Sequence, residues 1–138
     1  MHRAAIHLLL VCLAASVSGC EQKEPLGRIQ GRVTFQGAPV TEGLIVFNNA
    51  QKGVFMTAVL NTDGSYVVTS ATGPGLPLGE YRVMVTPPVD EAILGPNFEP
   101  PAPKPFPNIP QRYRDVNTSG LALKVAKGEN VFDVDMKP

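Results

Sequence analysis

The chain has 138 residues, with 12 basic and 12 acidic side chains, two histidines and two cysteines. This balance of charge excludes a strongly basic domain of the kind that binds nucleic acid, and two cysteines are too few for a small scaffold held together by several disulfides. The length is enough for one hydrophobic core rather than two.

The first nineteen residues are typical of a secretory signal peptide. His2 and Arg3 precede an apolar run over residues 4–15, and small residues follow it. This run is shorter than the roughly 20 apolar residues that a membrane-spanning helix needs. We therefore expect residues 1–19 to be cleaved rather than to remain as a permanent membrane helix.

Cys20 stands directly after this segment. The stretch Val17-Ser18-Gly19-Cys20 resembles the bacterial lipobox, in which a cysteine after two small residues is lipidated and becomes the new N-terminus. The resemblance implies that Cys20 carries several acyl chains, which together hold a protein stably at a membrane, and that residues 20–26 form a short tether. Glu21 stands where, in Gram-negative lipoproteins, an aspartate commonly signals retention in the inner membrane, and the lack of that aspartate favours the outer membrane. A secreted chain without lipid is the alternative.

The predicted location is therefore the cell envelope, with the membrane contacted through the lipid on Cys20 and the domain on the periplasmic or cell-surface side. Cleavage removes both histidines, His2 and His7, together with Cys12. The processed chain then has no imidazole for a Ser-His-Asp triad or general base and no His/Cys set for zinc. We expect no catalytic residue, no metal site and no cofactor.

Carboxylate chemistry stays open after this exclusion. A glycosidase-type pair of acids or a calcium site with oxygen ligands would need several converging Asp or Glu side chains. The acidic residues are scattered, mostly near turns or at alternate strand positions. They are better explained as solvated surface.

Apolar residues alternate with polar ones along most of the remaining chain, which predicts half-buried β-strands. In the first strand Ile29, Val33 and Phe35 are expected to face inward, and in residues 80–86 Tyr81, Val83 and Val85. The seven predicted strands cover residues 27–35, 43–47, 54–60, 65–69, 80–86, 121–125 and 130–136.

Turn residues lie between these strands. Asn61-Thr62-Asp63-Gly64 predicts a hairpin over residues 53–70, and the turn at residues 126–129 is expected to join the last two strands. Seven short strands without helical periodicity predict an all-β fold, a seven-stranded antiparallel β-sandwich that spans residues 27–138 as a single domain.

One region departs from the strand pattern. Residues 87–110 hold nine of the fourteen prolines, and proline removes a backbone donor and fixes φ. This proline-rich loop should run as extended polyproline-II chain over the surface. Long connections of this kind are uncommon and are often functional or disordered.

The order of "GRVTFQGAPVTEGLIVF", "NTDGSY", "LPLGEYRVMVTPP" and "IPQRYRDVNTSGLALKVAKGENVFDVDM" resembles the small carboxypeptidase regulatory-like, or transthyretin-like, domain lipoproteins of planctomycete bacteria. The resemblance covers nearly the whole mature chain, and the tail from Ile109 to Met136 is its most specific part. It implies a seven-stranded transthyretin-like sandwich on a lipid anchor and no enzymatic activity. No catalytic or metal-binding residue is carried over.

Candidate binding residues lie in and just after the proline-rich loop. They are Phe106, Arg112, Tyr113 and Arg114. Arginine forks and an aromatic face could bind a carboxylate or a sugar. In the alternative interpretation, Tyr113 closes the open end of the sandwich while Asp115 pairs with an arginine.

Three functions follow from the sequence. The favoured one is a non-enzymatic, lipid-anchored module of the cell envelope that binds a protein or a glycan, since functional contacts tend to sit on loops held by rigid scaffolds. A small carboxylate-based hydrolase is the second. The third, a carrier of a small ligand of the transthyretin type, rests on fold analogy alone.

Overall fold

The computed structural model describes residues 24–89 and 104–138. The expected signal peptide, Cys20 and most of the proline-rich loop lie outside the described residues. In the described part, no helix is long and apolar enough to cross a membrane.

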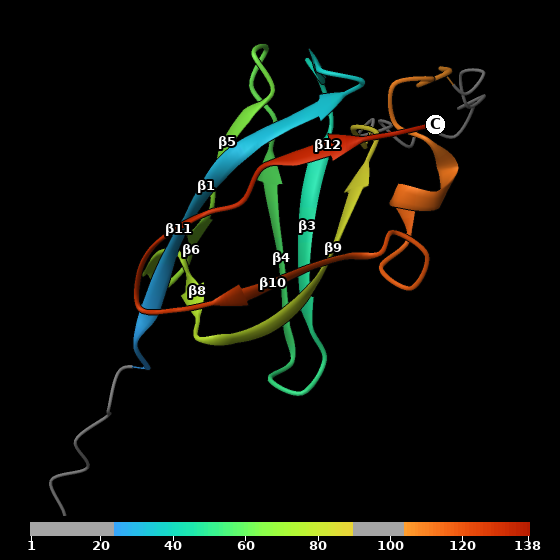
Figure 1. Cartoon of the computed structure of the whole chain (residues 1–138). Coiled ribbons are helices and arrows are strands. Elements are labelled where there is room, and N and C mark those ends of the chain that lie inside the picture. Colours follow the sequence, from blue (N-terminus) through green and yellow to red (C-terminus); the bar gives the residue numbers. More distant parts are fainter. Residues whose placement is uncertain (1–23, 90–103) are drawn as a thin grey trace, which may run out of the picture.

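The described residues form an all-β fold built mainly from two facing sheets (Figure 1). In the first sheet β1 (Leu26–Phe35) pairs with β11 (Gly128–Val131), β12 (Val134–Met136), β2 (Ala38–Pro39), β5 (Ser65–Val67) and β8 (Leu76–Pro77). The second sheet has the order β10 (Leu121–Val125), β9 (Gly79–Thr86), β3 (Leu44–Asn49), β4 (Val54–Val59). A small third sheet pairs β6 (Thr69–Ser70) with β7 (Gly73–Pro74), and one 3₁₀ helix, η1, spans Gln111–Arg114.

The hydrophobic core lies between the two main sheets, where alternate residues of each strand point inward. Tyr81, Val83 and Val85 are at most 1% exposed, which confirms the inward set predicted for β9. In β1, Ile29 and Val33 are buried as predicted, whereas Phe35 at the strand end is half-buried. The period of two therefore identified the buried faces correctly, apart from one strand terminus.

The predicted hairpin over residues 53–70 is wrong. β4 pairs instead with β3, with Asn49 opposite Val54, and β5 pairs with β1 in the other sheet, with Gly31 opposite Tyr66. The Asn61–Gly64 turn exists, with the Gly64 N–H donating to the Asn61 carbonyl oxygen over 2.8 Å. This turn carries the chain from one sheet to the other. Leu60 before the turn and Tyr66 after it are then both buried in the core between the sheets.

The expectation of purely antiparallel pairing is wrong for the C-terminal strands. β1 pairs in parallel with both β11 and β12, while β10 pairs antiparallel with β9 in the second sheet. The turn at residues 126–129 thus crosses between sheets. With this crossing, Val125 of β10 and Val134 of β12 enter the same core from opposite sheets. A hairpin within one sheet would not place them on facing sheets.

The number of strands also differs from the seven predicted, since the described residues contain twelve strand segments. Residues 65–69 divide into β5 and the start of β6, and residues 130–136 divide into β11 and β12. Short segments such as β2 and β8 pair with β1 for two residues each. Strands this short have no detectable alternation, so the period of two could not indicate them.

The break between β11 and β12 lies against Gly31 in the middle of β1. A Cβ atom on Gly31 would stand 2.0 Å from the Phe132 carbonyl oxygen. That oxygen accepts a hydrogen bond from the Tyr66 hydroxyl over 2.6 Å, and the Asp133 carboxylate accepts one from the Arg32 N–H over 2.8 Å. These bonds satisfy backbone groups that the interrupted ladder leaves unpaired, so the close crossing depends on glycine at residue 31.

Asp135 on β12 is hydrogen-bonded to residues at the end of β1. From these bonds we predict that stability depends on pH. Its carboxylate accepts hydrogen bonds from the Lys137 ammonium, from the Gly37 N–H over 3.0 Å and from the Thr34 hydroxyl over 2.8 Å. These bonds, that of Lys137 foremost, lower the pKa of Asp135 from 3.8 to about 2. Because the folded-state pKa is depressed, the stabilisation is complete above about pH 4 and is lost as the pH falls through about 2.

We therefore expect Asp135→Asn to be less stable than wild type at about pH 6, and we expect most of this difference to disappear as the pH is lowered to about 2. Urea unfolding followed by circular dichroism measures the difference. Glu129→Gln, which removes an exposed ion pair with Arg28, is the control and should change stability little. A gap between wild type and Asp135→Asn that is the same at both pH values would contradict the prediction.

Candidate functional site

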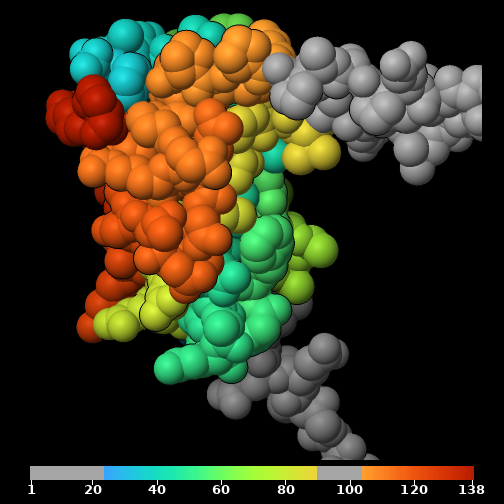
Figure 2. Space-filling model, turned by 90° about the vertical axis from the view of Figure 1, so that its right-hand side faces the viewer, coloured from blue at the N-terminus to red at the C-terminus, as the bar shows by residue number. Residues whose placement is uncertain are grey.

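The four residues proposed for binding from the sequence lie together at one end of the sandwich. η1 and the preceding residues 104–110 cover this end, and Figure 2 shows these orange residues close to the red C-terminal strand. The prolines and the single turn of η1 place Tyr113 inward, where it is 5% exposed. This position is the one given by the alternative interpretation, in which Tyr113 closes the end of the sandwich.

Tyr113 and Arg112 contact each other. The Arg112 guanidinium carbon stands 4.6 Å from the centre of the Tyr113 ring, and the guanidinium also donates a hydrogen bond to the Tyr113 hydroxyl. The Lys137 N–H donates a second bond to this hydroxyl over 3.0 Å. Burial opposes ionisation of Tyr113, but these two bonds and the neighbouring positive charges lower its pKa overall. The hydroxyl is thus occupied by contacts within the protein.

Arg114 and Phe106 are joined through the backbone. Arg114 donates from Nε to the Ile109 carbonyl oxygen over 2.8 Å and from a terminal nitrogen to the Phe106 carbonyl oxygen over 3.0 Å. The Phe106 ring is half-buried against the core and lies 5.2 Å from the Lys104 ammonium. Arg114 therefore uses its planar fork to hold the segment before η1.

The structure gives Tyr113, Arg114 and Phe106 contacts that support the fold, and it leaves Arg112 exposed over the tyrosine ring. A binding role for the four residues stays a prediction. The expected ion pair of Asp115 with an arginine is wrong for the described residues. The Asp115 carboxylate accepts instead from the Asn117 N–H over 2.7 Å, an Asx turn that begins the connection to β10.

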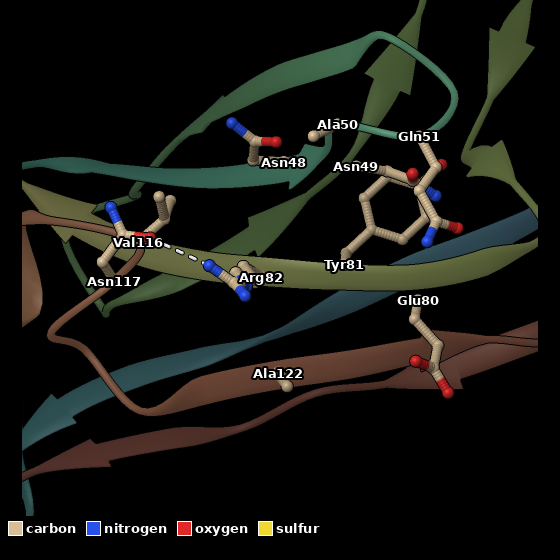
Figure 3. A pocket seen from close by; sticks show the side chains of 10 residues that line it. All are labelled: Asn48, Asn49, Ala50, Gln51, Glu80, Tyr81, Arg82, Val116, Asn117 and Ala122. Atoms are coloured by element: carbon tan, nitrogen blue, oxygen red, sulfur yellow. Dashed lines mark hydrogen bonds between the residues drawn. The ribbon is translucent and has the colours of Figure 1, made fainter.

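A polar groove lies elsewhere, on the outer face of the second sheet (Figure 3). It has a volume of about 650 Å³. Its floor contains a row of residues that are directly opposite one another on adjacent strands, Ala122 on β10, Arg82 on β9 and Asn48 on β3. Its lining residues are Asn48, Asn49, Ala50, Gln51, Glu80, Tyr81, Arg82, Val116, Asn117 and Ala122.

The strand pattern explains why these side chains meet. Asn48, Glu80 and Arg82 occupy outward positions on β3 and β9, while the β3–β4 turn brings Gln51 to one end of the groove and the loop before β10 brings Asn117 to its side (Figure 3). Tyr81 points between the sheets. Its hydroxyl donates to the Pro77 carbonyl oxygen over 2.9 Å, and burial raises its pKa.

Some of the polar groups in the groove already have partners. Arg82 donates to the Asn117 side-chain oxygen over 2.8 Å, and the Asn49 side-chain oxygen accepts from the Lys52 N–H over 3.1 Å. The side chains of Asn48, Gln51 and Glu80 form no hydrogen bond with any described residue. The groove thus combines carboxamides, which donate and accept, with one cation and one carboxylate.

The sequence predictions did not identify this groove. The alternation had placed Glu80 and Arg82 outward, but nothing local indicated that Asn48 or Asn117 would lie beside Arg82. Strand register and the path of the loop before β10 bring them together. The short run of amides at the end of β3, with Asn48 at an outward strand position and Asn49 and Gln51 close after it, is a signal that could have been noted.

No group of three or more His, Cys, Asp or Glu side chains in the described ranges could hold a metal ion. Glu80 is the one carboxylate among the residues that line the groove. The chain matches no protein-family model, no curated protein and no solved structure.

Proposed function

We propose that this protein is a non-enzymatic module of the cell envelope that binds a glycan in the groove formed by Asn48, Gln51, Glu80, Arg82 and Asn117. The observation that carries the proposal is the concentration of carboxamide side chains in one groove on a rigid sheet. Sugar hydroxyls donate and accept hydrogen bonds, as carboxamides do. The single arginine and single carboxylate add charge-assisted bonds of both kinds.

The charge of the chain favours a neutral ligand. The mature chain has eleven basic residues, since Arg3 leaves with residues 1–19, against twelve acidic ones, which gives a net charge of −1. The groove itself contains one residue of each sign, Arg82 and Glu80. A nucleic acid would require a basic surface. An envelope protein that contacts the proline-rich loop is the other partner that the sequence suggested.

The tether in this proposal is the lipid on Cys20, which rests on the lipobox-like stretch of residues 17–20. The resemblance to carboxypeptidase regulatory-like lipoproteins agrees with a binding module outside the cytoplasm. β1 begins at Leu26, so the tether of residues 20–26 is short. An anchored module of this kind would hold its ligand close to the membrane.

The two other functions have less support. A carboxylate-based hydrolase needs two acids within roughly 5–10 Å in one cleft, and the described lining of the groove provides Glu80 alone. A carrier of a small apolar ligand needs an enclosed apolar cavity, whereas the groove is an open hollow on the outer face of the sheet, and six of its ten lining side chains are amides or charged groups.

The test is binding of the purified full chain to a panel of immobilised neutral oligosaccharides and peptidoglycan fragments. The affinity for each glycan that retains the protein is then measured in solution by calorimetry. We expect Arg82→Gln and Asn48→Ala each to weaken binding at least about tenfold, because the first removes the charged guanidinium donors and the second removes a carboxamide from the groove. Arg28→Gln, on the other sheet, is the matched control and should bind as wild type does. Retention by no glycan in the panel, or wild-type affinity of Arg82→Gln, would overturn the proposal.

A further inference from the structure

Among the described residues, β4 is an edge strand of the second sheet. It pairs with β3 on one side, and no strand in the described ranges pairs with its other side (Figure 1). Edge strands are commonly protected by lysine, by proline or by a bulge, and β4, with the sequence Val-Phe-Met-Thr-Ala-Val, contains no lysine, proline or charge. Lys124 lies on β10 at the opposite edge of the same sheet.

The outward side chains of β4 are apolar and exposed. Phe55 is 60% exposed and Val59 is 70% exposed, with the exposed Thr57 between them on the same face. On the inner face of β4, Ala58 is buried in the core. β4 therefore presents exposed apolar side chains at the edge of a sheet, a combination that favours pairing with another strand.

At the same residues, the backbone of β4 has hydrogen-bonding groups that pair with no other strand of the described part of the chain. The Leu60 N–H donates to the carbonyl oxygen of Gly43, its partner in the β3–β4 register, over 3.0 Å. In an antiparallel ladder alternate residues bond to the partner, so the even-numbered residues of β4 bond to β3. Phe55, Thr57 and Val59 consequently direct their N–H and C=O groups away from the sheet.

We infer that two copies of this chain associate through antiparallel pairing of β4 with β4, in a register centred on Thr57. Thr57 then lies opposite Thr57 of the second copy, and Phe55 lies opposite Val59 on either side. A second copy of this chain is the partner that fits, because the outward side chains Phe55, Thr57 and Val59 match those of an antiparallel copy when Thr57 is at the centre. Aromatic with β-branched pairs and threonine pairs are favourable across strands, and no like charges oppose each other.

The pairing has two-fold symmetry, as most protein dimers do. The axis runs perpendicular to the sheet, so the second sheets of the two copies join into one continuous sheet and their outer faces lie on the same side. The polar grooves of both copies would then face one surface. The association itself does not depend on any ligand in the groove.

Disulfide trapping tests the register. In the full chain with Cys12 and Cys20 replaced by serine, Thr57→Cys should form a covalent dimer under mild oxidation, because opposed residues in a hydrogen-bonded pair have Cα atoms about 5.5 Å apart. Val67→Cys, which is also at an exposed position, 61% on β5 of the other sheet, is the matched control. Equal cross-linking of the two variants would overturn the inference.

Sedimentation in mild detergent tests the association without any cysteine. One strand pair buries less area than a stable dimer interface, so wild type is followed up to about 1 mM, where weak complexes form. We expect a concentration-dependent dimer that Thr57→Lys abolishes and Val67→Lys retains, with unchanged circular dichroism for both variants. A wild type that stays monomeric up to about 1 mM would overturn the inference. So would a β4 that pairs with a strand of a different protein and not with a second copy of this chain.

Discussion

Replacing Gly31 with alanine is expected to lower the free energy of unfolding by about 3 kcal/mol. The added methyl group would stand 2.0 Å from the Phe132 carbonyl oxygen and 3.0 Å from the Tyr66 hydroxyl. The first obstacle is backbone, so the clash cannot be relieved by rotating a side chain. The connection between β11 and β12 would have to move away from β1, and the hydrogen bond from Tyr66 to Phe132 would lengthen with it.

Urea unfolding of Gly31→Ala beside Gly53→Ala measures this effect. A Cβ atom on Gly53 meets no atom within 4 Å, but its φ of +63° makes a side chain unfavourable. Gly53→Ala should therefore cost about 1 kcal/mol from backbone strain alone. If Gly31→Ala were no less stable than Gly53→Ala, the close crossing of β1 by the C-terminal segment would be wrong.

Replacing Phe47 with alanine is expected to lower the free energy of unfolding by about 4 kcal/mol. Phe47 lies on β3 and is completely buried. Its ring centre stands 6.1 Å from that of Tyr66 on β5 and 6.4 Å from that of Phe132, so it contacts aromatic rings of the facing sheet. Its removal would leave a cavity between the sheets and remove favourable aromatic pairs.

Phe55→Ala is the matched control for Phe47→Ala, because Phe55 lies on the adjacent strand but points outward. Its side chain is 60% exposed, so we expect a change of about 0.5 kcal/mol or less. Thermal and urea unfolding at low protein concentration, where association does not contribute, compare the two variants. A loss for Phe55→Ala as large as that for Phe47→Ala would contradict the assignment of inner and outer faces.

Much of the local structure could be predicted from the sequence, because the alternation of side chains along a strand is a property of each strand alone. The period of two placed Tyr81, Val83 and Val85 inward and Arg82 outward, and all four lie as expected. Proline and glycine residues likewise marked the ends of most strands. An all-β fold with one core followed from these patterns.

The pairing of strands could not be predicted in the same way. The turn at Asn61–Gly64 has the same local sequence whether it joins two strands of one sheet or crosses between sheets. The choice depends on which arrangement buries Leu60, Tyr66 and Val68 together, and that is a property of the whole core. The parallel pairing of β1 with β11 and β12 has the same cause.

The candidate sites also differ in whether they could be predicted from the sequence. Sequence reasoning brought out Arg112, Tyr113 and Arg114, which are adjacent in the chain, and the structure uses Arg114 and Tyr113 to close the end of the sandwich. The polar groove joins Asn48, Arg82 and Asn117 from three separate segments. The amino-acid sequence alone determined the composition, the faces of the strands and the lipobox-like stretch, because these are properties of the residues and of their local order. Strand register and the assignment of strands to sheets are decided by long-range burial, and they create the groove and the edge position of β4.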